Sequence, residues 1–319
     1  MPCDVGRPAL AIEFEPRFCA MHVADLTAGC TFGCLYCPFA EIGARRRRAS
    51  RPTPLDVSAL PALAAPRSLF LSPASDPFAP QAVTATHALL AHLLPKGTTI
   101  GIVTKGVIPD DTVALLAQHR EQIEGVAIGV TSLDDARNRI LEPGCPRAVD
   151  RLANVERLAA GGLTVAVRLD PLFPELDDEP SALRTIIRAA ATRGAWAITA
   201  TYVFAWGRYL RRLKRVPLLA ASWPHLSEKA PMEGGTAFSV PLARKLETYQ
   251  QIARLSANEG LRFNTCGCKD LRVRDANLFS ARCRNTWYLA DQDAVATRSE
   301  GSRAPVPEAP PAPQATPRP

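Results

Sequence analysis

The sequence lacks several features that mark particular classes of protein. Aromatic residues make up 6% of its 319 residues, and histidine occurs five times. No apolar run reaches the length of about 20 residues that a membrane-spanning helix requires. The first residues include acidic side chains and have no apolar core of a secretory signal. No internal repeat is present. These absences exclude a membrane-spanning protein and a repeat protein, and they predict a cytoplasmic location without a membrane partner.

Complete disulfide pairing is also excluded, because nine cysteines are an odd number. In a reducing compartment disulfides are rare, so metal binding or redox chemistry explains so many thiols better. The net charge of +7 suits an acidic partner such as nucleic acid, and it equally suits an ordinary solvated surface. No aromatic RNA-binding pattern and no Cys/His zinc finger accompanies the charge, which favours the solvated surface.

Short apolar runs alternate with longer amphipathic segments from about residue 23 to residue 263. This alternation predicts strand and helix units around a parallel sheet. Six such units predict an α/β fold, namely a partial (β/α)6 barrel of the TIM type, in which ligands bind at the carboxyl ends of the strands. The expected strands are residues 22–27, 68–72, 98–104, 125–131, 163–169 and 196–203, and the expected helices are residues 82–94, 111–119, 148–160 and 182–192.

The composition divides the chain into four segments. Residues 1–20 form an N-terminal extension, and residues 21–264 form the barrel. Residues 265–291 form a short cap that contains cysteines. Residues 292–319 are rich in proline and alanine, and we expect this tail to be disordered because it has too little apolar surface to offset its ordering entropy.

Three cysteines follow the first expected strand with the spacing CxxxCxxC, namely Cys30, Cys34 and Cys37. Thiolates so close in sequence can converge on one iron–sulfur cube, and two glycines ease the sharp path of the loop. The fourth iron then has no nearby protein ligand, so one coordination site stays open for a substrate or cofactor. The alternative is a set of structural or zinc-binding cysteines, for which His22 is the one local fourth ligand.

This loop resembles the cluster loop of the radical S-adenosylmethionine (SAM) superfamily. The resemblance implies a [4Fe–4S] cluster on the three cysteines, SAM bound to the open iron, and reductive cleavage of SAM to a radical that abstracts hydrogen from a substrate. Tyr36 occupies the place of the aromatic residue that the family has beside adenine. The resemblance also implies a physiological electron donor of the flavodoxin or ferredoxin type.

Residues at later strand ends resemble one branch of that superfamily, the spore photoproduct lyase-like proteins or DNA repair photolyase homologues, over about half of the chain. The resemblance implies that Ser75 and Asp76 lie at the SAM amino group, that Lys105 pairs with the SAM carboxylate, and that Thr131 or Ser132 reaches the ribose or carboxylate. The plain alternatives are a turn with a helix cap at the Ser-Asp pair and a solvated lysine.

The sequence EPG at residues 142–144 also resembles a signature of this branch. We expect Glu142 to pair with Arg151 and to hold this loop. The chain departs from spore photoproduct lyase at the residue that returns a hydrogen atom to thymine, a cysteine two residues before the Ser-Asp element. Pro73 stands there and has no S–H group, which argues against reversal of a thymine dimer. Cys145 is an alternative donor, although a small buried cysteine explains it more simply.

A second group of cysteines follows the barrel, namely Cys266, Cys268 and Cys283. Their spacing resembles that of ligands to an auxiliary iron–sulfur cluster in several radical SAM modifying enzymes. A pair of structural thiols that covers the mouth of the barrel explains them equally well. Two basic stretches, residues 45–48 and 208–215, suit a phosphate backbone, although such runs are more often solvated surface.

Two substrate classes therefore stay open for a radical SAM enzyme. A nucleic-acid base or lesion fits the lyase-like motifs and the basic charge. A peptide, a protein or a small metabolite fits the candidate second cluster and the missing donor cysteine. A non-enzymatic iron–sulfur module for electron transfer is a third interpretation, but it would not need SAM-binding residues at several strand ends.

Overall fold

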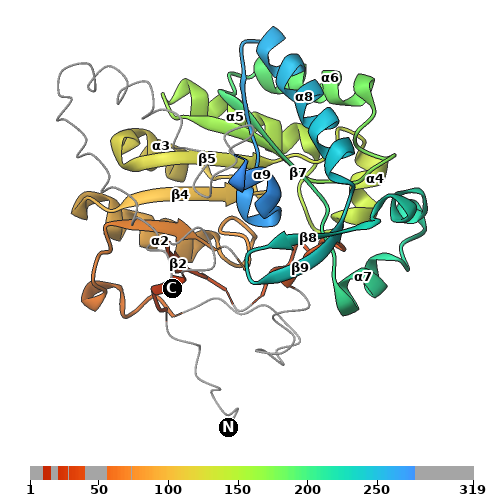
Figure 1. Cartoon of the computed structure of the whole chain (residues 1–319). Coiled ribbons are helices and arrows are strands. Elements are labelled where there is room, and N and C mark those ends of the chain that lie inside the picture. The colour runs from red at the N-terminus through yellow and green to blue at the C-terminus, as the bar shows by residue number, and fades with distance from the viewer. Residues whose placement is uncertain (1–9, 16–20, 28, 40–55, 73, 277–319) are drawn as a thin grey trace, which may run out of the picture. The chain divides into compact units, whose positions relative to one another are not determined.

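The computed structural model describes residues 10–15, 21–27, 29–39, 56–72 and 74–276 (Figure 1). All of them belong to one compact unit, Met1–Trp287. An eight-stranded sheet with the order β1-β2-β3-β4-β5-β6-β7-β10 forms its centre. Seven of these strands are parallel, and β1 pairs with β2 in the antiparallel direction.

The described elements have the following bounds. The strands of the large sheet are β1 (Glu13–Glu15), β2 (Met21–Ala24), β3 (Ser68–Leu71), β4 (Thr99–Thr104), β5 (Ile123–Gly129), β6 (Val165–Leu172), β7 (Ala197–Tyr202) and β10 (Arg262–Asn264), and a separate hairpin consists of β8 (Glu228–Met232) and β9 (Gly235–Ser239). The α-helices are α2 (Val83–Leu93), α3 (Asp110–Gln118), α4 (Asp135–Leu141), α5 (Ala148–Ala160), α6 (Pro180–Ala191), α7 (Gly207–Leu213), α8 (Leu242–Asn258) and α9 (Leu271–Asp275). Turns of 3-10 helix cover Leu60–Ala62, Leu94–Lys96, Arg120–Gln122, Pro217–His225 and Gly267–Lys269.

The core explains why the six expected strands were visible in the sequence. Strands β4 to β7 are buried along almost their whole length, as parallel strands covered on both faces are, so they appear as continuous apolar runs. Val126 and Ile128 of β5 are fully buried in the main hydrophobic cluster. Between them, Ala127 points to the other face, where it packs with Ala166 and Ala197 of the next two strands.

The six strands and four helices predicted from the sequence are present, with ends shifted by a few residues. A seventh parallel strand, β10, lies beside β7 and was not predicted, because it has only three residues. Helix α8 was also not predicted. Its buried positions include Lys245, Thr248 and Ser256, so no clean apolar stripe marks it. The predicted boundaries at residues 20, 264 and 291 stay predictions.

None of the described helices combines the length and the apolar character that a membrane span would need.

Candidate active site

The cluster loop, residues 29–39, follows β2 at the carboxyl edge of the parallel sheet. Cys30, Cys34 and Cys37 lie on this loop, and each is partly buried. The N–H of Cys37 donates to the carbonyl of Cys34 at 3.0 Å, which closes a tight turn between two of the thiols. Gly33 has a φ of 59°, a backbone conformation that glycine adopts without strain. One tight turn of this loop therefore carries both Cys34 and Cys37.

Within the described part of the chain, no three Cys, His, Asp or Glu side chains converge on one point as the ligands of a single ion would. In an iron–sulfur cube each thiolate binds a different iron, so its sulfurs do not need to converge on one point. Burial raises the pKa of Cys30 to about 12, and the nearby charges of Asp76, Cys34 and Cys37 add to this rise. The pKa of Cys34 is instead lowered, because its sulfur has a hydrogen bond with Cys145 and lies near the charge of Lys105. Bound iron would offset the cost of a thiolate at Cys30.

The EPG loop, residues 142–144, packs directly against the cluster loop. The N–H of Gly144 donates to the carbonyl of Phe32 at 3.0 Å. A Cβ atom on Gly144 would lie 2.5 Å from the carbonyl oxygen of Thr31, a distance that no side chain tolerates. Glycine at this position therefore permits the close approach of the two loops.

Glu142 is the buried centre of this arrangement. It forms an ion pair with Arg151 at 2.5 Å, and both side chains are fully buried, which confirms the expected pairing. It also accepts hydrogen bonds from the hydroxyls of Tyr36 and, at 2.8 Å, Thr131. Burial alone would raise the pKa of Glu142, but the charges of Lys105 and Arg151 outweigh burial and lower it. Glu142 is therefore held as a carboxylate.

Lys105 follows β4 and reaches over β5 toward the cluster loop. A Cβ atom on Gly129 would lie 2.8 Å from Cγ of Lys105, so this glycine makes room for the lysine side chain. The ammonium group lies 5.5 Å from the ring centroid of Tyr36. Burial would lower the pKa of Lys105, but the charges of Glu142 and the Cys34 thiolate raise it above its ordinary value. A stable cation therefore stands beside the cluster loop, where it can pair with an anionic ligand.

Asp76 connects the ends of two strands. One carboxylate oxygen accepts a hydrogen bond from the Thr104 hydroxyl at 2.6 Å and another from the N–H of Phe78 at 2.9 Å. The other oxygen accepts from the N–H of Lys105 at 2.8 Å. Asp76 therefore positions the backbone of Lys105. This role is that of a turn-forming residue, which was the alternative to SAM binding for the Ser-Asp pair. Its contact with SAM stays a prediction.

The three hydroxyl residues predicted to contact SAM have different surroundings. Ser75 donates to Asp25 at 3.2 Å, and Ser132 accepts from the N–H of Asp134 at 3.0 Å, so both stabilise turns. Thr131 instead lies inside the site, where its hydroxyl donates to Glu142. The structure thus brings Tyr36, Lys105 and Thr131 together around Glu142, and it leaves the two serines on flanking turns.

Helix α7 supplies two contacts to the cluster loop that sequence reasoning missed. The Tyr209 hydroxyl donates to the carbonyl of Tyr36 at 2.5 Å, and a guanidinium nitrogen of Arg212 donates to the carbonyl of Cys37 at 2.7 Å. The partners in the second contact are 175 residues apart in the sequence. Such a contact cannot be predicted from the sequence, because any tyrosine or arginine can donate to a main-chain carbonyl.

Cys145 follows the EPG loop and adds a fourth thiol to this region. Its sulfur lies 3.6 Å from the sulfur of Cys34, and the side chain is partly buried. From the sequence, Cys145 was an alternative hydrogen donor or, more simply, a small buried cysteine. Its proposed role as a hydrogen donor stays a prediction.

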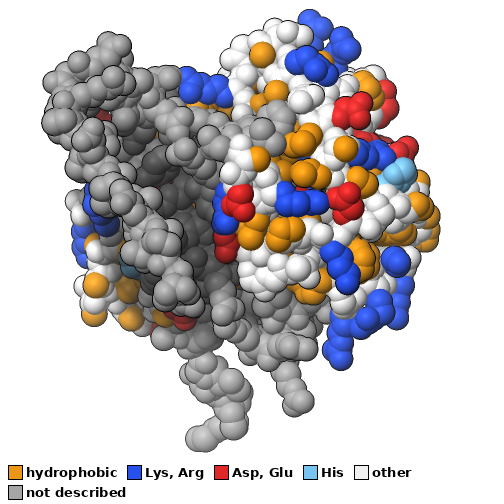
Figure 2. Space-filling model, viewed as in Figure 1, with side chains coloured by type: hydrophobic (Ala, Val, Ile, Leu, Met, Phe, Trp, Pro, Cys, Tyr) orange, Lys and Arg blue, Asp and Glu red, His pale blue; other side chains and the backbone are white. Residues whose placement is uncertain are grey.

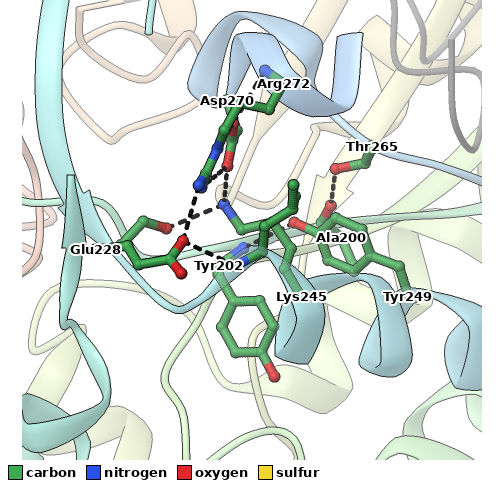
Figure 3. A network of polar contacts seen from close by, with 10 residues as sticks. Ala200, Tyr202, Glu228, Lys245, Tyr249, Thr265, Asp270 and Arg272 are labelled. Carbon is green, nitrogen blue, oxygen red and sulfur yellow. Dashed lines mark hydrogen bonds and ion pairs between the residues drawn. The ribbon is translucent and has the colours of Figure 1, made fainter. Parts of the chain in front are cut away.

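A polar network holds the CxC segment, residues 265–270, at both of its ends (Figure 3). The Thr265 hydroxyl donates to the carbonyl of Ala200 in β7 at 2.6 Å. At the other end, Asp270 forms ion pairs with Lys245 of α8 at 2.6 Å and with Arg272 of α9 at 2.8 Å. The side chains of Asp270 and Lys245 are 4% and 2% exposed, so the first of these ion pairs is buried.

The CxC segment also lies at the carboxyl edge of the sheet. It follows β10, and Lys269 forms an ion pair with Asp170 of β6 at 2.5 Å. The sulfurs of Cys266 and Cys268 are 3.0 Å apart. Cys283, Pro73 and the basic stretch 45–48 lie outside the described residues.

Comparison with known proteins supports the same family. The sequence profile of the radical SAM superfamily matches residues 25–186, just over half of the chain. No curated protein matches the chain. Among solved structures, spore photoproduct lyase complexed with dinucleoside spore photoproduct is similar, with a TM-score of 0.61 and 13% identity over 80% of this chain and 78% of that chain. A double mutant of spore photoproduct lyase with bound AdoMet and the dinucleoside has a TM-score of 0.58 and 12% identity over the same shares of both chains.

At these identities the likeness to solved structures shows the fold alone, and it confirms the predicted radical SAM partial barrel. The match of the superfamily profile identifies the chemistry, for which a [4Fe–4S] cluster, SAM and a reductant are implied. The chain therefore belongs to the radical SAM superfamily of enzymes.

Proposed function

We propose that this chain holds a [4Fe–4S] cluster on Cys30, Cys34 and Cys37 and cleaves SAM reductively in the cytoplasm. The observation that supports this most directly is the packing of the three-thiol loop against the EPG loop, with the cation of Lys105 beside both. When bound, the cluster supplies the electron for SAM cleavage. The protein's own task is to orient SAM and to exclude competing reactions.

Two residues of the site have properties that suit SAM. The Lys105 ammonium can pair with the SAM carboxylate, and its raised pKa keeps it charged at neutral pH. The buried ring of Tyr36 next to it offers an apolar surface at the position that the family resemblance assigns to adenine. Glu142 fixes the Tyr36 hydroxyl and balances the lysine charge, which makes it a positioning residue.

The other residues predicted to contact SAM lie on turns that border the site. Thr131 stands next to Glu142, and we assign to it the ribose or carboxylate of SAM that the family resemblance implies. Ser75 and Asp76 shape the turn that faces the SAM amino group in the resemblance, and Ser132 borders the same site from the turn after β5.

For the substrate we propose a nucleic-acid base or lesion as the first class. The fold likeness to spore photoproduct lyase in complex with a dinucleoside and the net charge of +7 support this class. Pro73 speaks against thymine-dimer reversal with the hydrogen donor of that enzyme. The proposal is therefore hydrogen abstraction from a base or lesion, with the returning hydrogen atom supplied from elsewhere.

The CxC segment favours a second candidate, modification of a peptide, a protein or a small metabolite with an auxiliary cluster. Its two sulfurs, 3.0 Å apart, lie at the same edge of the sheet as the cluster loop, and buried contacts fix both ends of the segment. Two thiols held so close suit a shared soft metal centre. Cys283 would be the third ligand.

One anaerobic experiment tests the central proposal. The reconstituted protein is incubated with dithionite and SAM, and 5′-deoxyadenosine is measured by chromatography. We expect the nucleoside from the wild-type protein and none from the Cys34→Ala variant. Absence of the nucleoside from a wild-type protein that contains iron would overturn the proposal.

Two further measurements separate the substrate classes. Iron is counted in the triple variant C266A/C268A/C283A, where a content unchanged at about four irons per chain, the number in one cube, would eliminate the auxiliary cluster. Affinity for DNA and RNA is measured against salt concentration, because binding to phosphates weakens steeply as salt rises. Negligible binding at low salt would remove the support for the first class.

A further inference from the structure

Helix α7 has two faces with different surroundings. On its inner face, Tyr209 is buried and Arg212 packs over the Tyr209 ring, 5.6 Å from its centroid, while both side chains bind carbonyls of the cluster loop. Its outer face and the turn that follows expose four basic side chains to solvent. These are Arg208, Arg211, Lys214 and Arg215, and we call them the α7 basic face.

The sequence around this face is rich in basic residues. Residues 180–227 contain eight lysines and arginines and no aspartate or glutamate. Among the residues that the structure describes, no carboxylate forms an ion pair with any side chain of the α7 basic face. Figure 2 shows lysine and arginine side chains gathered at the lower right of the molecule, over the region where Figure 1 shows α7. An uncompensated basic face attracts an acidic partner and accelerates its association.

The position of this face relative to the cluster loop indicates which acidic partner it suits. A helix with its side chains is about 10 Å thick. A partner on the outer face of α7 would therefore be separated from the cluster loop by about one helix diameter. Arg212 connects the helix to the carbonyl of Cys37 by a hydrogen bond of 2.7 Å. Electron tunnelling falls steeply with distance, so a donor bound on this face would be well placed to reduce a cluster on the neighbouring loop.

We propose that the α7 basic face is the docking surface for an acidic electron-donor protein of the flavodoxin or ferredoxin class. The inference rests on the proposed function, because it requires a cluster on the neighbouring loop. In the step that docking serves, the donor loses one electron and the oxidised [4Fe–4S] cluster gains it, so no further oxidant or reductant is needed.

Nucleic acid fits this face less well than a protein. Surfaces that bind single strands combine basic residues with exposed aromatic rings on which bases stack. Of the aromatic residues in and next to α7, Tyr209 is buried, and Trp206 stacks on Phe204 with ring centroids 5.7 Å apart. The exposed side chains of α7 are basic and offer no stacking surface.

The test measures how fast a reduced acidic flavodoxin transfers an electron to the reconstituted full-length protein in anaerobic stopped flow. The variant R208E/R211E reverses two charges of the α7 basic face, and R208Q/R211Q removes them. The control R184E/R188E reverses two exposed arginines of α6, which lies at the top of the view while α7 lies at the lower right (Figure 1). All six substitutions are at exposed positions, where changes of stability are small.

We expect R208E/R211E to lower the second-order rate constant about tenfold at low salt, R208Q/R211Q to lower it less, and the control to leave it unchanged. The difference should nearly vanish at 1 M salt, where the Debye length is about 3 Å. The final yield of 5′-deoxyadenosine with dithionite should stay unchanged in all variants, because dithionite reduces the cluster without docking.

Three results would overturn the docking surface while leaving the proposed function intact. These are an unchanged rate in R208E/R211E, an equal loss in the α6 control, and a loss of DNA or RNA affinity in R208E/R211E without a change of the flavodoxin rate. A wild-type protein that forms no 5′-deoxyadenosine with dithionite would overturn the proposed function and the docking surface together.

Discussion

The cluster loop and the CxC segment both present thiols at the carboxyl edge of the sheet, but different forces hold them. Main-chain hydrogen bonds and the close contact at Gly144 fix the cluster loop. The CxC segment depends on charged side chains, chiefly Asp270 with Lys245 and Lys269 with Asp170. The charges around the cluster loop, those of Glu142, Arg151 and Lys105, lie on other elements, and Glu142 reaches the loop through the hydroxyl of Tyr36.

This difference teaches how each region should respond to substitution and pH. Main-chain contacts do not titrate, so the hydrogen bond between Gly144 and Phe32 should be kept over a wide pH range, whereas the contact of Tyr36 with Glu142 depends on the carboxylate. Buried ion pairs lose stability when one partner is removed or neutralised. Four sets of variants test this contrast.

Single replacement of Cys30, Cys34 or Cys37 by alanine should abolish both iron binding and SAM cleavage, because the cube needs all three thiolates. The double variant C266A/C268A should keep the visible absorbance of the cluster and the formation of 5′-deoxyadenosine. Iron analysis and chromatography after anaerobic reconstitution measure both. If C266A/C268A lost all of its iron, the two regions would not be separate sites.

The variant Glu142→Gln should lower the free energy of unfolding by about 3 kcal/mol, because it leaves the fully buried Arg151 without a counter-charge. It should also reduce iron incorporation, since Glu142 fixes Tyr36 of the cluster loop. Urea denaturation and iron analysis test both effects. The variant Asp150→Asn is the control, because its ion pair with Arg147 is exposed, and we expect no measurable change there.

The variant Gly144→Ala should cost about 1–3 kcal/mol and lower the iron content, because its Cβ would press on the carbonyl of Thr31 in the cluster loop. Gly97→Ala is a matched control. Gly97 has a φ of 80° and no atom within 4 Å of an added Cβ, so this variant should lose about 1 kcal/mol and keep its iron. Equal iron contents in the two variants would contradict the contact between the loops.

The variant Asp170→Asn should make stability less dependent on pH in the acid range. Burial would raise the pKa of Asp170, but Arg168 and Lys269 lower it below its ordinary value of 3.8. A carboxylate whose pKa is lowered in the folded state stabilises the fold at any pH above the pKa that it has in the unfolded chain. This contribution is lost as the pH falls toward the pKa of the folded state. The wild type should therefore lose about 1 kcal/mol more than the variant between pH 5 and pH 3. Parallel curves in urea denaturation would contradict this role of Asp170.

The sequence predicted much of this structure where the signal is local. Continuous apolar runs marked the buried strands, and the spacing of Cys30, Cys34 and Cys37 marked the loop after β2. The pairing of Glu142 with Arg151 was also accessible, because the two residues are nine positions apart in adjoining elements.

The rest depends on contacts between distant parts of the chain. Tyr209 and Arg212 reach main-chain carbonyls of the cluster loop, and main-chain acceptors leave no trace in the sequence. Helix α8 buries Lys245 against Asp270, so a charge stands where an apolar residue would have marked the helix. The α7 basic face was visible in the sequence as a basic run, but only the contacts of Tyr209 and Arg212 connect the helix with the cluster loop.

The central claim is that three thiolates hold a cluster with one iron open to SAM. Electron paramagnetic resonance of the dithionite-reduced protein, recorded with and without SAM, tests it most directly. We predict the signal of a reduced [4Fe–4S] cluster that changes when SAM is added, because SAM binds the open iron. A protein without this signal, or a signal that SAM leaves unchanged, would contradict the claim.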